Sequence, residues 1–302
     1  MTGNCFRHIA AAAGAALVAL PTMATAQEPA WHHSVPGQIG FQEPVTPIMD
    51  SIVVFHDGVL MWTITLITLL VLALLVIVMV KFNAKSNPVP STTTHNTFVE
   101  VVWTVLPIII LVVIAIPSFG VLADQMRVPD GERKYLGSNI FSFGDVEVPA
   151  ASLTIKATGS TWFWSYEYVD QGESFSSFML DEESRQASKP NQPRLLAVDN
   201  ELVVPVNTTV RVQVTASEVI HAFAVPSFGV KVDAVPGRLN ETWFNARKTG
   251  LYYGQCSELC GKDHAYMPIA VRVVTEEEFA AWMAALQAQN LAAANATLPP
   301  VT

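Results

Sequence analysis

The sequence is poor in charged residues. Only 14% of its 302 residues are Asp, Glu, Lys or Arg, against roughly 25% in an average soluble domain, and 51% are hydrophobic. A disordered chain would be rich in charge and poor in apolar residues, so this composition excludes a disordered chain and argues against a wholly soluble protein. Acidic residues outnumber basic ones, and the net charge of −9 disfavours nucleic acid as a partner while suiting a basic protein.

Cysteine is also scarce, and three cysteines are too few for a disulfide scaffold. One of them, Cys5, lies in Met1–Ala26, which has the features of a cleaved secretory signal: a basic Arg7, a short apolar core and a terminal Ala-Thr-Ala site. The apolar core Ile9–Leu20 has twelve residues, whereas a membrane-spanning helix needs about 20. We therefore expect this segment to be removed, which leaves the mature chain with two cysteines.

Two long uncharged stretches follow. Val59–Val80 has 22 residues and Val101–Ala123 has 23, so each is long enough as a helix to cross a hydrocarbon core of about 30 Å. The connecting loop carries Lys81 and Lys85, and the positive-inside rule places it in the cytoplasm. Both ends of the mature chain would then face the exported side.

These features predict four parts of the chain. They are a signal peptide at 1–26, an exported arm at 27–58, a transmembrane helix hairpin at 59–123 with its cytoplasmic loop at 81–100, and an exported domain at 124–302.

The exported domain carries short β-type segments separated by turn formers, a pattern typical of an all-β sandwich or barrel. The predicted strands are Ser152–Ala157, Trp162–Tyr168, Arg194–Val198, Thr209–Thr215, Ile220–Val225, Glu241–Phe244, Leu251–Tyr253 and Pro268–Val274. Only Glu276–Leu291 reads as helical, and Phe279, Trp282, Met283 and Leu286 predict its packing face. The domain has 14 basic and 21 acidic residues, so it carries most of the negative charge.

One short segment near the C-terminus holds four side chains that ligate metals. Cys256, Cys260, His264 and Met267 follow the spacing C-x3-C-x3-H-x2-M. Sulfur ligands with imidazole favour copper, and methionine beside histidine and cysteine is typical of electron-transfer copper sites. The segment lies between two predicted strands, so a rigid sandwich would hold the ligands.

A further nitrogen ligand is expected from His221, which begins an apolar predicted strand. Gly254 and Gly261 flank the cysteines and are expected to let the backbone wrap an ion closely. Two alternatives exist for the cysteines. A disulfide suits an oxidising compartment, and zinc also binds cysteine and histidine, although zinc sites rarely recruit methionine.

Residues 42–285 resemble cytochrome c oxidase subunit II, the copper-bearing subunit of haem-copper terminal oxidases. The matching strings are Phe55-His56-Asp57, Glu100–Pro107, Trp162–Tyr168, His221–Ser227, Val235–Asn240 and Gly254–Pro268. The signal peptide and long arm look like those of an alphaproteobacterial member. The resemblance implies a protein of the bacterial inner membrane, with both mature termini and the copper domain in the periplasm.

The resemblance also implies a cupredoxin-like β-sandwich that carries a binuclear copper A centre. Both cysteines would bridge the two coppers. His221 and Met267 would complete the ligands of one ion, and His264 with the backbone carbonyl of Glu258 would complete those of the other. The side chain of Glu258 would point to a magnesium ion at the interface with subunit I.

The implied function is that of subunit II of an aa3-type cytochrome c oxidase. Electrons would pass from cytochrome c to copper A and then to haem in subunit I, where oxygen reduction is coupled to proton pumping, and subunit III would be a further partner. Trp162 would receive the electron, and Glu100 would lie at the entrance of a proton route. Cytochrome c would be attracted by the acidic residues Glu167, Asp199 and Glu218. The alternative is that these residues are ordinary solvated surface charges.

A second hypothesis is a membrane-anchored periplasmic copper-delivery protein of the C-x3-C type. Such proteins resemble thioredoxins, so helices should alternate with strands. The nearly uninterrupted strand pattern of the exported domain argues against this hypothesis.

Overall fold

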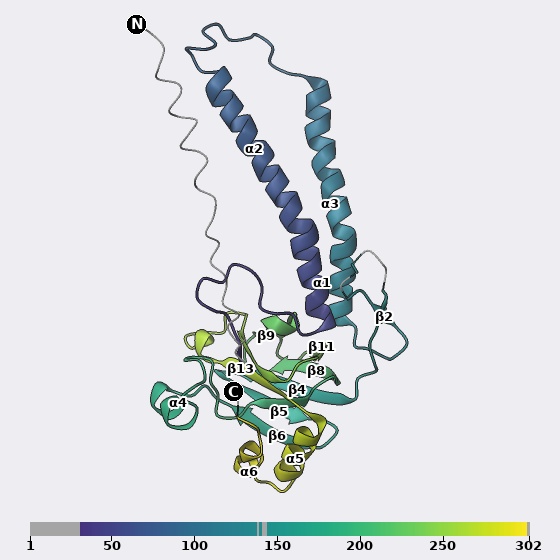
Figure 1. Ribbon diagram of the computed structural model, residues 1–302, viewed down its shortest axis with the longest axis vertical. Coiled ribbons are helices and arrows are strands. Elements are labelled where there is room, and N and C mark those ends of the chain that lie inside the picture. The colour runs from purple at the N-terminus through teal and green to yellow at the C-terminus, as the bar shows by residue number, and fades with distance from the viewer. Residues whose placement is uncertain (1–30, 138, 141–143, 301–302) are drawn as a thin grey trace, which may run out of the picture.

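The computed structural model describes residues 31–137, 139–140 and 144–300. Two long helices stand on a compact β-domain, and the C-terminal helices lie at the far end of that domain (Figure 1). The predicted signal peptide at 1–26 lies outside the described residues.

The first long helix begins earlier than the sequence predicted. It runs from Pro47 as α1 (Pro47–Phe55), passes through one π-helical segment, η1 (His56–Leu60), and continues as α2 (Met61–Lys81). Thr46 caps its start by accepting a hydrogen bond from the backbone N–H of Met49, at 3.1 Å. The last part of the predicted arm is therefore helical and packs on the β-domain.

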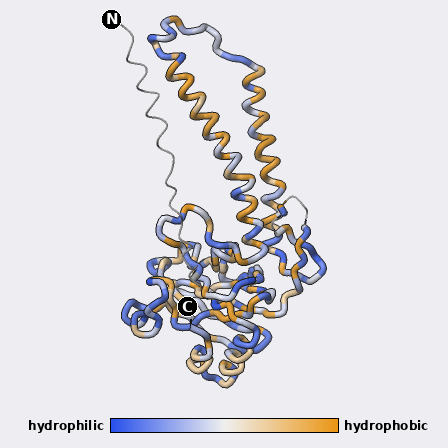
Figure 2. The backbone as a smooth tube through the Cα atoms, viewed as in Figure 1, coloured by the Kyte–Doolittle hydropathy of each residue, from blue (hydrophilic) through white to orange (hydrophobic). Residues whose placement is uncertain are grey.

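The second long helix, α3, spans Thr97–Met126 and contains Pro107 and Pro117. Asn96 caps it through Val99, and the Glu100 carboxylate accepts a hydrogen bond from the Asn96 backbone N–H at 3.1 Å. Pro47–Lys81 and Thr97–Met126 are both long and apolar enough to cross a membrane. Both helices are hydrophobic along most of their length (Figure 2), and most of their large apolar side chains are exposed.

The C-terminal end of α3 is fixed to the β-domain. Asp124 is buried and accepts hydrogen bonds from the backbone N–H of Leu136 at 2.7 Å and from Arg133 at 3.3 Å. Trp243 donates its indole N–H to the Asp124 carbonyl at 2.7 Å. A small hairpin of β2 (Lys134–Tyr135) and β3 (Val146–Glu147) completes this junction, which sets the height of the β-domain above the membrane-spanning segments.

Two sheets face each other in the β-domain. The larger has the order β10-β9-β12-β13-β7, with β1 also paired to β12, and the smaller has the order β11-β8-β4-β5-β6. The larger sheet contains β1 (Trp31–His32), β7 (Leu202–Pro205), β9 (His221–Val225), β10 (Val230–Ala234), β12 (Gly250–Cys256) and β13 (Pro268–Val274). The smaller contains β4 (Leu153–Ser160), β5 (Phe163–Tyr168), β6 (Glu173–Ser177), β8 (Thr209–Ala216) and β11 (Asn240–Asn245).

Alternation along the strands builds the core between these sheets. On β5, Trp164, Tyr166 and Tyr168 are fully buried, as expected for residues that share one face of a strand. The C-terminal helix α5 (Glu276–Gln287) covers one end of the core and buries Trp282. Its start is fixed by a capping box between Thr275 and Glu278. The predicted fold class, a membrane hairpin followed by a cupredoxin-like β-sandwich with a C-terminal helix, is confirmed.

Several details of the prediction are wrong. The strands β6, β7 and β10 were not predicted. Arg194–Val198 forms no strand, because Leu195 has a left-handed φ of 68° and only Val198 makes an isolated bridge, to Met179. The C-terminal segment is not the only helical one in the β-domain. Residues Glu182–Ser188 form α4 and residues Leu291–Ala296 form α6.

A buried ionic cluster links the segment after α4 to the β13–β7 edge of the larger sheet. Glu201 is 2% exposed and accepts hydrogen bonds from Lys189 and Gln192, both at 2.8 Å, and from Arg272 at 2.7 Å. Burial alone would raise the pKa of Glu201, but the two cations outweigh it and lower the pKa to about 2. Arg272 also donates to the Pro299 carbonyl at 3.3 Å, so the cluster anchors the C-terminal segment.

We predict that Glu201→Gln lowers the free energy of unfolding by about 3 kcal/mol, because it leaves buried cations without their counter-charge. For a domain of this size that loss corresponds to about 6–12 °C in Tm. The carboxylate stabilises the native state above its unfolded pKa, and this contribution is lost as the pH falls from about 5 to about 2. Circular dichroism melts of detergent-solubilised protein across this pH range measure both effects.

The matched control is Glu147→Gln, since Glu147 is 80% exposed in its pair with Lys134. Its expected effect is under about 1 kcal/mol. Equal Tm values for the two variants at neutral pH would show that the Glu201 cluster does not stabilise the fold.

Candidate metal centre

Pairing between two strands brings the distant His221 to the C-x3-C loop. Cys256 ends β12 and is in register with Phe223 of β9, two residues after His221. The next residue, Ser257, donates its backbone N–H to the Ala222 carbonyl at 3.1 Å. The loop then turns through η3 (His264–Tyr266) into β13, so both ends of the ligand loop are held by the larger sheet.

The predicted ligand atoms converge. The Cys256 Sγ lies 3.7 Å from the His221 Nδ1, and the Cys260 Sγ lies 3.5 Å from the His264 Nδ1 and 3.6 Å from the Met267 Sδ. The two Sγ atoms are 3.8 Å apart. The carbonyl oxygen of Glu258 is 3.3 Å from the Cys256 Sγ. All six predicted donors therefore surround one small volume.

The two cysteines are free thiols in this arrangement. A disulfide would hold their sulfurs about 2.05 Å apart, well below the 3.8 Å seen here. Cys256 and Cys260 are 6% and 7% exposed, and His221 and Met267 are fully covered. The donor set of two thiols, two imidazoles and a thioether suits a soft transition metal and does not suit magnesium or calcium.

Burial changes the proton affinity of these groups. It raises the pKa of the Cys260 thiol to about 12, with the neighbouring Cys256 adding to the rise. It lowers the pKa of His221, with a further contribution from His264. The neutral imidazole, which is the form that ligates metals, is therefore favoured at His221.

Glycines make room for the ligands in a way that the sequence did not reveal. A Cβ on Gly159 of β4 would lie 3.0 Å from the Cβ, Cγ and Cδ2 atoms of His221. A Cβ on Gly254 would lie 2.0 Å from the carbonyl oxygen of Ala224, so this glycine permits the close approach of β12 to β9. Gly261 has a φ of +122° and lies against the Trp162 ring.

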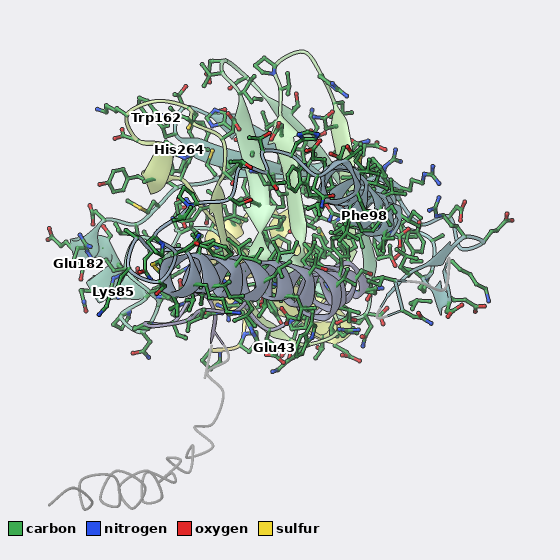
Figure 3. The ribbon with its side chains drawn as sticks, turned by 90° about the horizontal axis from the view of Figure 1, so that it is seen from above. Glu43, Lys85, Phe98, Trp162, Glu182 and His264 are labelled. Atoms are coloured by element: carbon green, nitrogen blue, oxygen red, sulfur yellow. The ribbon has the colours of Figure 1, made fainter. Side chains whose placement is uncertain are left out.

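Two tryptophans support the loop from the smaller sheet. The partly exposed Trp162 donates its indole N–H to the Cys260 carbonyl at 3.1 Å, and Lys262 Nζ lies 5.7 Å from the centroid of its ring. The buried Trp164 donates to the Met267 carbonyl at 3.3 Å. Figure 3 shows Trp162 and His264 together at one edge of the β-domain. Nothing in the sequence indicates the hydrogen bond of Trp164 to the ligand loop.

The predicted acidic residues have different surroundings. Glu218 accepts two hydrogen bonds from Thr161, the residue before Trp162, and these bonds with one from Ser217 lower its pKa. Glu167 pairs with Lys156 at 3.3 Å. Asp199 accepts from the backbone N–H groups of Phe178 and Asn200, both at 2.7 Å. Glu218 is thus the one of the three that is hydrogen-bonded to the residue next to Trp162.

Comparison with known proteins identifies the family. The family model for the cytochrome c oxidase subunit II transmembrane domain matches residues 34–121, and that for the periplasmic domain of the same subunit matches residues 153–274. A probable cytochrome c oxidase subunit 2 of Rickettsia bellii is 48% identical over 280 residues, covering 92% of each chain. The chain belongs to the cytochrome c oxidase subunit II family.

Two further relatives are similar. Cytochrome c oxidase subunit 2 of Cereibacter sphaeroides is 41% identical over 290 residues, which cover 90% of this chain and 89% of the relative. The crystal structure of the periplasmic domain of subunit II of cytochrome oxidase of Bradyrhizobium japonicum is 62% identical, with a TM-score of 0.43, and covers 47% of this chain and 98% of that one.

Membership of this family makes the chain a membrane-anchored subunit of an oxidase, whose partners are other oxidase subunits. It also separates the two functional hypotheses. A copper-delivery protein of the thioredoxin type would alternate helices with strands, whereas the described β-domain is a two-sheet sandwich. The structure and the family together favour the oxidase hypothesis.

We predict that Gly159→Ala displaces His221 and weakens metal binding, while the β-domain stays folded. The added methyl group meets the His221 side chain at 3.0 Å, and the ring can move only into the donor cluster or the core. Metal content and the visible spectrum of the purified protein report the displacement, and circular dichroism reports the fold.

Gly40→Ala is the matched control, because a Cβ at Gly40 meets nothing within 4 Å. Unchanged metal content and spectrum in Gly159→Ala would mean that His221 is not a ligand or that the site can accommodate the added methyl group.

Proposed function

We propose that the donor cluster holds a binuclear copper A centre through which the chain passes electrons from cytochrome c to the oxidase. The observation that carries the proposal is the pair of buried free thiols, 3.8 Å apart and flanked by two imidazoles and a thioether. When bound, the copper pair would accept and donate single electrons.

The donors of the chain would divide between the two copper ions. Cys256 and Cys260 would bridge both ions, since each sulfur faces the cluster from a different position in the loop. His221 and Met267 would bind one ion, and His264 with the Glu258 carbonyl the other. This set is all soft or borderline donors apart from one carbonyl oxygen, which supports copper over zinc.

A rigid scaffold would keep the geometry unchanged between oxidation states. Four of the side-chain donors are buried, and the backbone around them is fixed by sheet pairing and by the indole N–H groups of Trp162 and Trp164. Such rigidity favours fast electron transfer because few atoms have to move when the charge changes.

Trp162 would be the point at which electrons enter. It is partly exposed, and its indole is hydrogen-bonded to the carbonyl of the ligand Cys260. The side chains of Leu259 and Tyr266 in the ligand loop, and of Ile220 next to His221, are exposed. A mixed apolar face of this kind, on a domain with excess acidic residues, suits a transient contact with basic cytochrome c. Glu218, Glu167 and Asp199 would supply part of the attractive field.

The other parts of the proposal concern the assembled enzyme. The Glu258 side chain is exposed and would contribute a hard oxygen ligand to magnesium at the interface with subunit I. Glu100 lies in the first turn of α3 and would mark the entrance of a proton route used in pumping. Subunits I and III would be partners, and the β-domain would lie in the periplasm above the inner membrane.

We predict that Cys256→Ser abolishes the absorption and electron paramagnetic resonance signature of a mixed-valence copper pair, because a hydroxyl is a poor bridging ligand for copper. Ser257→Ala, a change at the exposed neighbour, should leave that signature intact. A signature that survives in Cys256→Ser would refute the proposed bridge.

We predict that Trp162→Phe slows reduction of the centre by cytochrome c severalfold while the copper spectrum stays the same. Phenylalanine keeps an apolar ring but loses the hydrogen bond to the Cys260 carbonyl. Stopped-flow mixing with reduced cytochrome c measures the rate. If the copper spectrum changes in this variant, Trp162 is a structural support for the loop and not a route for electrons.

A further inference from the structure

The Trp162 ring, which we propose receives electrons, has the ammonium of Lys262 over it. Lys262 follows Gly261 in the ligand loop, and its Nζ lies 5.7 Å from the centroid of the Trp162 ring. The Lys262 side chain is 77% exposed, so its charge lies at the outer surface of the loop. An ammonium within about 6 Å of an indole face is attracted to the ring by about 0.5–1 kcal/mol at exposed sites.

The positive charge of Lys262 is only weakly compensated by a carboxylate. Asp263 is the nearest carboxylate, at 3.7 Å, and both partners are exposed to solvent. An exposed pair at this distance contributes little and is screened by salt. The positive charge of Lys262 therefore remains available to any molecule that contacts Trp162.

A shallow groove beside the Trp162 ring carries carboxylates. The groove, of about 490 Å³, is lined by Thr161, Trp162, Phe163, Phe178, Met179, Asp263 and Tyr266. The one charge among these lining residues is the carboxylate of Asp263, which also pairs with Lys262, and the Glu218 carboxylate is hydrogen-bonded to Thr161. This groove is the acidic side of the ring, while the ring itself lies within reach of the Lys262 ammonium.

We infer that Lys262 is a specificity-determining residue, which excludes cationic side chains of the partner from the indole and directs them to the acidic side of the ring. The inference rests on the proposed function of the site, because it concerns how the electron donor docks. A positive charge within an otherwise acidic face repels the basic partner most in those orientations that place a cation against it. Repulsion of this kind is a general means of selecting one bound orientation over others.

The test uses the assembled oxidase with Lys262→Gln, Lys262→Glu and Lys262→Arg. With basic cytochrome c at low ionic strength, we expect Lys262→Gln to lower KM and the Kd of the complex by about two- to fivefold, as one exposed repulsion is removed. Lys262→Glu should lower both further and steepen their dependence on salt. Lys262→Arg keeps both the charge and the contact with the ring and should match the unmodified enzyme.

Lys231→Gln is the matched control, since it changes the net charge equally. Lys231 is exposed on β10 and lines a different groove, together with Gln125 and Met126 at the end of α3. Its expected KM and Kd are those of the unmodified enzyme.

Unchanged or raised KM and Kd in Lys262→Gln would overturn the inference, and so would an altered copper spectrum, because the lysine would then act on the metal loop. These outcomes differ from failure of the proposed function. In that case the unmodified oxidase would lack the copper signature or would not oxidise cytochrome c through this subunit.

Discussion

Two thiols kept close together but unbonded are the constraint on which the rest of the β-domain depends. Their sulfurs are buried and lie 3.8 Å apart, and burial raises the pKa of the Cys260 thiol. Forming the thiolates that ligate a metal is therefore costly unless a cation is bound between them. With a metal the same burial excludes water and keeps the ligands in place. The loop is therefore built for an ion that compensates two thiolate charges.

The scaffold explains why the loop keeps this shape. β9 delivers His221, β12 delivers Cys256, and β13 begins directly after Met267, so one sheet positions ligands from distant parts of the sequence. The opposite sheet closes the site through Trp162 and Trp164. The glycine at position 159 lets His221 fit between the two sheets. The anchored end of α3 then fixes this domain relative to the membrane-spanning helices.

The sequence predicted what depends on local pattern. The C-x3-C-x3-H-x2-M spacing is local and strongly indicates a metal loop, and long apolar runs indicate spanning helices. For His221 the sequence predicted a position in a strand, but its approach to Cys256 could not be read from local pattern because it depends on the pairing of β9 with β12. The space at Gly159 depends on contact between two sheets, and the cation over Trp162 on the turn at Gly261. The Arg194–Val198 prediction failed because the apolar run that follows Arg194 does not reveal a left-handed φ at Leu195.

The most direct test of the central claim is the copper-to-protein ratio of the purified protein, measured together with its electron paramagnetic resonance spectrum. We predict two copper ions for each chain and a hyperfine pattern from one unpaired electron shared equally by both. One copper ion with a localised electron, or zinc in place of copper, or a disulfide between Cys256 and Cys260 in protein grown with ample copper, would contradict the account.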